Sequence, residues 1–182
     1  MRLLRRNIAA IGLLLLPAIF AVAQRRPGVQ VDNVNQLARS SGYIFSGTVL
    51  KIQRTAAGED AIAFTQVSFR VDQAIQGVRS GEILTIREWS GLWDSGERYR
   101  PGERVLLFLY PASKLGLTSP VGGTLGRFAV DRAGKIHITG PQRQSLSFHR
   151  PHSQFTGRTR VSPREFAHEI LNASGNKHEQ VR

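Results

Sequence analysis

The sequence predicts a small, mainly β domain in which five or six strands close into a Greek-key barrel, with a short helix at each end. Three observations predict it. Apolar and polar residues alternate along much of 43–138, Gly and Pro clusters separate the alternating segments, and no internal repeat or second domain is visible. The chain has about the length of one domain, and we assign the barrel to residues 32–140.

The first 23 residues are expected to be a secretory signal peptide. Three arginines without an acid precede an apolar run at 8–20, and Ala21 and Ala23 form a small-residue cleavage site before Gln24. An uncleaved membrane anchor is the alternative, but a bilayer span takes roughly 20 apolar residues and this run is shorter. We therefore expect a secreted or periplasmic protein, cleaved after Ala23, with a flexible start at 24–31 and no transmembrane segment in the mature chain.

A short helix and three strands open the domain. Val34, Leu37 and Ala38 share one face of the helix, and Gly42 ends it. The period-two pattern predicts strands at residues 43–53, 62–75 and 82–89. The side chains expected to share one side of the first strand are those of Ile44, Ser46, Thr48, Leu50 and Ile52. Gly47 lies mid-strand, where a glycine usually marks a bulge or a bend.

The inward face of the second strand centres on Val67, Phe69 and Val71. Further along, the continuous apolar run within 104–110 suits a central strand that is buried on both faces. Two short strands, at 126–131 and 135–138, flank a hairpin turn at 132–134.

The C-terminal part is expected to end in a helix. Residues 141–161 are polar and basic, and we expect an irregular segment there. Ser162 and Glu165 form a capping box, in which each side chain bonds the other residue's backbone N–H, and this predicts a helix at 162–172. Residues 173–182 are expected to be a disordered tail.

An open barrel of the OB type is the simplest closure of these strands, and a small sandwich is the alternative. The segments S-G-Y-I-F-S-G-T-V, V-S-F-R-V-D-Q-A-I-Q-G, G-E-I-L-T-I-R-E-W and Y-R-P-G-E-R-V-L-L-F-L-Y resemble, in this order, bacterial exported proteins with a TIMP-like or netrin-like OB fold. Animal members of that wider group inhibit metalloproteinases through an N-terminal Cys. This chain has no Cys, so that mechanism does not carry over, and the resemblance implies a barrel that binds a ligand of unassigned identity.

Composition narrows the function classes. The absence of Cys excludes disulfides, thiolate metal sites and Cys nucleophiles. The formal net charge of +12 fits attraction to an anionic envelope component, although scattered basic residues also fit a solvated surface. OB barrels also bind single-stranded nucleic acid, but export removes the usual partner, so we do not expect nucleic acid.

No complete catalytic constellation is visible. The five histidines are His137, His149, His152, His168 and His178, and their spacing gives no set of three or four zinc ligands. The loop serines lie in no nucleophile elbow. We therefore expect a non-enzymatic binding module without a cofactor, and the alternative is a metal-binding or hydrolytic envelope enzyme that uses these histidines.

Two long loops hold the candidate partner-binding residues. Large aromatic and Arg side chains near a loop mouth are typical of binding hot spots. The candidates are Trp89, Leu92, Trp93, Arg98, Tyr99 and Arg100 in the first loop, and Leu115 and Leu117 in the loop 111–125. Their partner would be a protein or an anionic envelope component. The alternative interpretation is that Trp89 and Trp93 plug an open end of the barrel.

Overall fold

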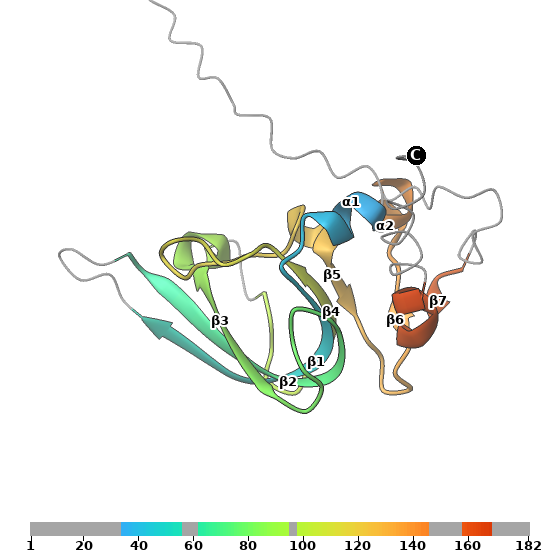
Figure 1. Cartoon of the computed structure of the whole chain (residues 1–182), viewed down its shortest axis with the longest axis horizontal. Helices are drawn as coiled ribbons and strands as arrows, with labels where there is room; N and C mark the ends of the chain where they lie inside the picture. Colours follow the sequence, from blue (N-terminus) through green and yellow to red (C-terminus); the bar gives the residue numbers. More distant parts are fainter. Residues whose placement is uncertain (1–33, 56–61, 95–97, 146–157, 169–182) are drawn as a thin grey trace, which may run out of the picture.

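The fold is a five-stranded antiparallel sheet with a second, two-stranded sheet beside it (Figure 1). The computed structural model describes residues 34–55, 62–94, 98–145 and 158–168. The expected signal peptide, the start at 24–31 and the tail at 173–182 lie outside these residues.

The strand order is β3-β2-β1-β4-β5 in the large sheet, and β6 pairs with β7 in the small one. The elements in chain order are α1 (Val34–Arg39), β1 (Tyr43–Thr55), β2 (Phe64–Gln76), β3 (Ile83–Trp89), the 3-10 helix η1 (Ser90–Trp93), β4 (Arg104–Leu109), the 3-10 helix η2 (Gly123–Gly126), β5 (Arg127–Ala129), β6 (Ile136–His137), α2 (Gly140–Ser145) and β7 (Arg160–Val161). The prediction of a mainly β domain is confirmed. Within the described residues the large sheet stays open, with β3 and β5 as its two edges, rather than closing into a barrel.

Strand β1 bends at Gly47, as the sequence predicts. The pairing of β1 with β2 shifts register between Ser46 and Gly47. A Cβ atom at Gly47 would lie 2.7 Å from the carbonyl oxygen of Arg70, which real Cβ atoms do not tolerate. Glycine is therefore needed where the two backbones approach most closely.

A later register shift in β1 overturns part of the expected side-chain alternation. The shift lies between Val49 and Lys51 and leaves Leu50 41% exposed. Beyond this bulge Ile52 pairs with Val67 and packs on the inward side, away from the side expected for it. The physical reason is that an extra residue in one strand exchanges the two faces for every residue that follows.

Strand β4 is buried on both faces, as predicted. Its Val105, Leu107 and Leu109 belong to one hydrophobic core, and its Leu106 and Phe108 belong to another. The η1-side core adds Phe45, Val49, Val67, Phe69, Val71, Ile86, Trp93 and Tyr99. The α1-side core adds Val34, Leu37, Ala38, Ile44, Val121, Phe128, Val130, Ile136, Ile138, Val161 and Phe166. One strand therefore joins two apolar layers.

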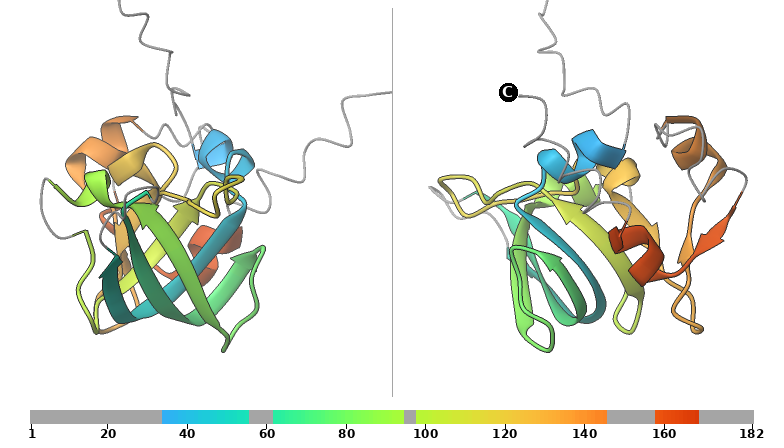
Figure 2. Two further views of the ribbon diagram at one scale, coloured as in Figure 1. Left: turned by 90° about the vertical axis from the view of Figure 1, so that its left-hand side faces the viewer. Right: turned by 45° about the vertical axis from the view of Figure 1, so that its right-hand side comes forward.

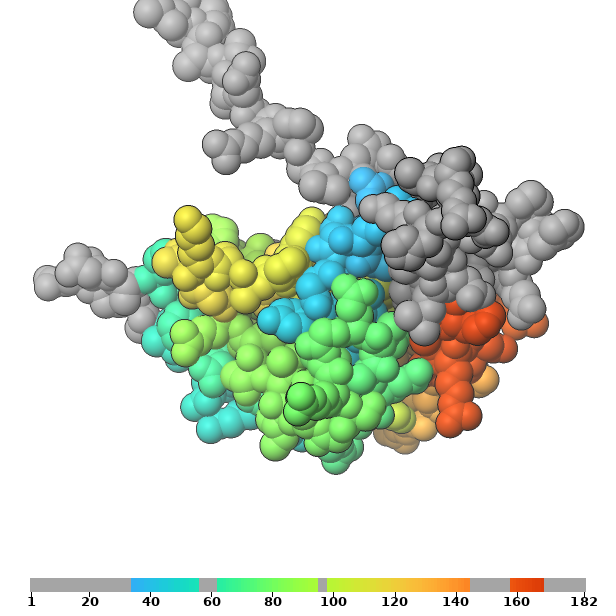
Figure 3. All heavy atoms as spheres, in the orientation of Figure 1, coloured from blue at the N-terminus to red at the C-terminus, as the bar shows by residue number. Residues whose placement is uncertain are grey.

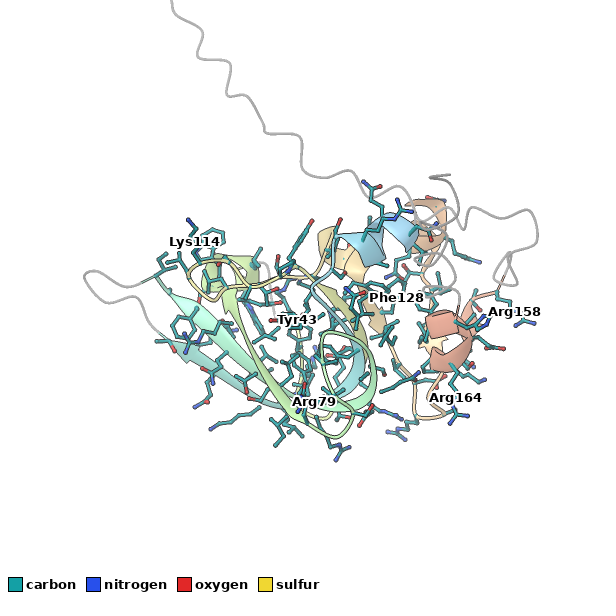
Figure 4. The ribbon with its side chains drawn as sticks, in the orientation of Figure 1. Tyr43, Arg79, Lys114, Phe128, Arg158 and Arg164 are labelled. Atoms are coloured by element: carbon teal, nitrogen blue, oxygen red, sulfur yellow. The ribbon has the colours of Figure 1, made fainter. Side chains whose placement is uncertain are left out.

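The C-terminal elements cover the α1-side core. Of the helix predicted at 162–172, the described part is helical at 163–168, and Figure 2 shows this C-terminal helix and the small sheet to one side of the large sheet. Phe166 packs against Phe128 and Phe108, with ring centroids 5.2 and 6.1 Å away. Figure 4 shows Phe128 on the side of the large sheet that faces the C-terminal helix. The predicted capping box forms: the Glu165 N–H donates to Ser162 Oγ at 3.2 Å, and the Ser162 N–H donates to Glu165 Oε2 at 2.8 Å.

The segment 141–161, expected to be irregular, contains regular structure in its described part. It holds most of α2 and all of β7. The Ile138 N–H donates to the Thr159 carbonyl at 3.0 Å, and Val161 is buried, so one apolar residue anchors a two-residue strand. A strand this short has no periodicity from which to predict it.

No helix of the described segments is long and apolar enough to cross a bilayer.

Candidate functional site

The end of β3 sends two neighbouring side chains to opposite faces. Glu88 follows the inward alternation of Ile86 and is fully buried, whereas Trp89 points outward and is 54% exposed. The indole of Trp89 lies over Gly91, where any Cβ atom would collide with the ring. Gly91 therefore makes room for the ring against η1.

The loop that follows β4 is held by its own hydrogen bonds. The Ser113 N–H donates to the Leu117 carbonyl at 2.8 Å, and Thr118 Oγ1 donates to the Tyr110 carbonyl at 2.6 Å. The Thr118 N–H also donates to the Arg87 carbonyl at 2.8 Å, which fixes the loop to the edge of β3. The loop after β4 is thus brought beside the end of β3 and η1, which lie far from it in the sequence.

A shallow pocket of about 260 Å³ lies between these loops. It is lined by Trp89, Leu92, Tyr110, Pro111, Ser113, Leu117, Thr118 and Ser119. None of the lining side chains carries a charge at neutral pH. In Figure 3 the loop 111–119, in yellow, stands above the lighter green end of β3, and Figure 4 shows Lys114 at the outer tip of that loop.

A polar network centred on Glu88 lies buried in the η1-side core. Trp93 Nε1 donates to Glu88 Oε2, and Tyr99 Oη donates to Glu88 Oε1, both at 3.1 Å. Arg98 Nε lies 3.2 Å from Glu88 Oε2, as an ion pair rather than an aligned hydrogen bond. Burial raises the pKa of the Glu88 carboxyl above its ordinary value, against the lowering effect of Arg98 and of the two donors.

Two further arginines stack on the aromatic rings of this network. The Arg54 guanidinium lies 5.7 Å from the Trp93 ring centroid, and that of Arg127 lies 5.0 Å from the Tyr99 ring centroid. Arg127 also pairs with Glu103 at 2.5 Å. Burial, with the nearby Glu88 carboxylate, raises the pKa of Tyr99 well above its ordinary value, so Tyr99 stays protonated as a donor. These contacts hold Trp93 and Tyr99, and with them the segment between β3 and β4, against the η1-side core.

The predicted binding residues divide into three groups. Trp89, Leu92 and Leu117 line the pocket. Leu115 is 63% exposed at the loop tip, and Arg100 is exposed while its backbone N–H donates to Glu103. Trp93, Tyr99 and Arg98 instead serve the buried network, so the plug interpretation describes Trp93 but not Trp89.

Sequence reasoning missed five of the eight residues that line the pocket. The missed residues are Tyr110, Pro111, Ser113, Thr118 and Ser119. A signal was present for the buried side of the site, because Glu88 continues the alternation of Leu84 and Ile86 and so had to face the core. A carboxylate facing a core requires hydrogen-bond donors nearby, and Trp93 and Tyr99 supply them.

The histidines do not converge in the described part of the chain. His137 Nε2 lies 3.1 Å from Asp131 Oδ2, and His168 is exposed in the C-terminal helix. The other three lie outside the described residues. No group of three His, Asp or Glu side chains that could hold a metal ion occurs among the residues described.

Comparisons with protein-family models, curated proteins and solved structures found no match to this chain.

Proposed function

We propose that this chain is an exported, non-enzymatic binding module that holds a protein partner at the pocket between the end of β3 and the loop 111–119. The observation that carries the proposal is an exposed indole, Trp89, at the rim of an uncharged apolar pocket. Exposed Trp beside an apolar pocket is the usual chemistry of an interface hot spot. Trp89 is held against Gly91, so little side-chain freedom is lost when a partner binds.

Export and the OB-like barrel belong to the same proposal. Export rests on the charged, apolar and small-residue parts of residues 1–23. The OB-like reading is supported by the strand order, by the bulges that bend β1, and by the Thr118–Arg87 backbone bond, which draws the loop before β5 to the edge of β3. On this proposal the pocket lies at one end of an open, OB-like barrel.

The chemistry of the pocket suits binding better than catalysis. Its hydroxyls, Ser113, Thr118 and Ser119, are not paired with a His or a carboxylate in the described residues. Glu88, the carboxylate next to Trp89 in the sequence, accepts hydrogen bonds from Trp93 and Tyr99 on the other face of β3. A hydroxyl without a base is a weak nucleophile.

A peptide selection tests the proposal. The mature chain, 24–182, is used to select random peptides displayed on phage, and enriched peptides are titrated by calorimetry. We expect peptides with an aromatic or aliphatic anchor, and Trp89→Ala or Leu117→Asp should weaken their binding about tenfold or more. Thermal unfolding of each variant checks that the fold is retained.

Ile83→Ala is the matched control. Ile83 is 67% exposed on the same strand but lies six residues from Trp89, about 20 Å along an extended chain. Its replacement should leave peptide affinity unchanged. Failure to enrich any peptide, or equal losses at Ile83 and Leu117, would overturn the proposal.

A further inference from the structure

The outward face of β1, β2 and β3 carries an ordered set of polar side chains next to the pocket. Cross-strand pairing places them in two rows, Gln53–Gln66–Arg87 and Lys51–Ser68–Thr85. Ser68 Oγ and Thr85 Oγ1 are 2.9 Å apart, as expected for neighbours on one face. Neighbouring strands lie about 4.8 Å apart and rows about 7 Å apart, so these side chains form a patch about 10 Å wide. We call this patch the β1–β3 face.

The β1–β3 face is cationic. Lys51 and Arg87 are exposed, and no carboxylate in the described segments pairs with either. Arg70 continues the outward side of β2. The acid beside it, Asp72, is already paired with Arg70 at 3.3 Å and with Arg104 at 3.7 Å. The face therefore presents positive charge with its acid neutralised.

An aromatic pair borders the face at the end of β3. Phe64 and Trp89 are cross-strand partners. The Arg87 guanidinium lies 5.1 Å from the Phe64 ring centroid, which holds this cation in place. Trp89 keeps more than half of its surface exposed, so a planar apolar ring stands at the border of the face, one row beyond Arg87 and Gln66.

This combination discriminates between classes of ligand. A bilayer needs a contiguous apolar patch, but Ile83 and Trp89 stand at opposite ends of β3 with polar rows between them. Single-stranded nucleic acid needs successive stacking rings, and Phe64 is covered by Arg87. Sugar hydroxyls match amides and hydroxyls, the C–H face of a sugar ring matches indole, and sugar carboxylates match Lys and Arg. We propose that the β1–β3 face binds an acidic polysaccharide, at a surface that shares Trp89 with the pocket but not Leu117.

Affinity electrophoresis of the mature chain tests this inference. The gels contain polygalacturonate, neutral dextran or polyglutamate, which carries carboxylates without sugars. We expect retardation by polygalacturonate, none by dextran, and at least about tenfold weaker retardation by polyglutamate. Raising the salt from about 20 to about 150 mM should weaken the retardation, because exposed charges are screened.

Paired variants separate this face from charge in general. Lys51→Gln with Arg87→Gln should weaken polygalacturonate binding about tenfold. The control, Arg132→Gln with Arg143→Gln, removes the same charge from the exposed β5–β6 turn and α2, and should keep affinity within about twofold.

A third variant and the pocket variant complete the test. Gln53→Ala with Gln66→Ala should also weaken binding to polygalacturonate, which charge alone does not explain. Leu117→Asp should leave it unchanged, so this inference and the protein-partner proposal fail separately. No retardation by polygalacturonate, equal retardation by polyglutamate, or equal losses in the two double charge variants would overturn the inference.

Discussion

Glu88 is fully buried in the η1-side core, where it accepts hydrogen bonds from Trp93 and Tyr99, both at 3.1 Å. Glu88→Ala removes both acceptors and leaves two buried donors without partners, at about 1–3 kcal/mol each. It also removes the carboxylate 3.2 Å from Arg98 and leaves a cavity. We therefore expect Glu88→Ala to lower the free energy of unfolding by about 3–5 kcal/mol, the usual cost of breaking a buried ion pair.

Glu88→Gln keeps the shape and isolates the charge. Burial raises the pKa of Glu88 in the folded state above its ordinary value of 4.5. A carboxyl group whose pKa is raised by folding contributes stability that is complete below the unfolded pKa and is lost as pH rises through the folded pKa. The wild type should therefore lose stability relative to Glu88→Gln as pH rises from about 4.5, by about 1.4 kcal/mol for each unit by which the pKa is raised.

Urea unfolding measures both effects. Wild type and the two variants are unfolded at a series of pH values from about 4.5 to 7.5, with Trp fluorescence as the signal. The free energies are compared at each pH. A loss below about 1 kcal/mol for Glu88→Ala would refute the reasoning, because one orphaned buried donor alone costs that much. Parallel pH profiles for wild type and Glu88→Gln would refute the assigned direction of the pKa shift.

Three other predictions concern packing and export. Gly47→Ala should destabilise the fold by about 2 kcal/mol or more in urea unfolding, because the new methyl group meets the Arg70 carbonyl, and a change below about 0.5 kcal/mol would contradict the close approach. Phe166→Ala should cost about 3–5 kcal/mol by the same measurement, because Phe166 is buried against two other rings, and a near-neutral result would separate the C-terminal helix from the core. Expressed with its own N-terminus in a bacterial host, the exported product should begin at Gln24 by intact mass, and retention of the full chain in the cytosol would contradict the signal assignment.

Much of the sheet could be predicted from the sequence, because period-two alternation reports burial directly. Val67 and Phe69 alternate with polar residues and face the core, and the continuous apolar run of β4 reports burial on both sides. Alternation fails at a bulge. The exposure of Leu50 depends on its pairing with β2 and not on its own neighbours, so the side taken by Ile52 was predicted wrongly.

The candidate site was harder to predict because chemically similar residues separate in space. Trp89 and Trp93 are four residues apart, yet one is exposed at the pocket and the other is buried on Glu88. Composition cannot distinguish them. The alternation along β3 could have done so for Trp89, because Glu88 faces inward and the next residue must then face outward. The position of the pocket wall from Tyr110 to Ser119 depends on backbone hydrogen bonds, among them the one from the Thr118 N–H to the Arg87 carbonyl, and residue types do not predict such bonds.

The side chains of β4 alternate between the α1-side core and the η1-side core, and this couples the stability of the two cores. Removing residues 158–168 would take Val161 and Phe166 from one layer, and the resulting loosening would reach the opposite layer through the shared backbone. The chain should therefore melt as a single cooperative unit, in which a truncation remote from the pocket is felt there. Shortened fragments would be poor substitutes for the whole domain in any binding experiment.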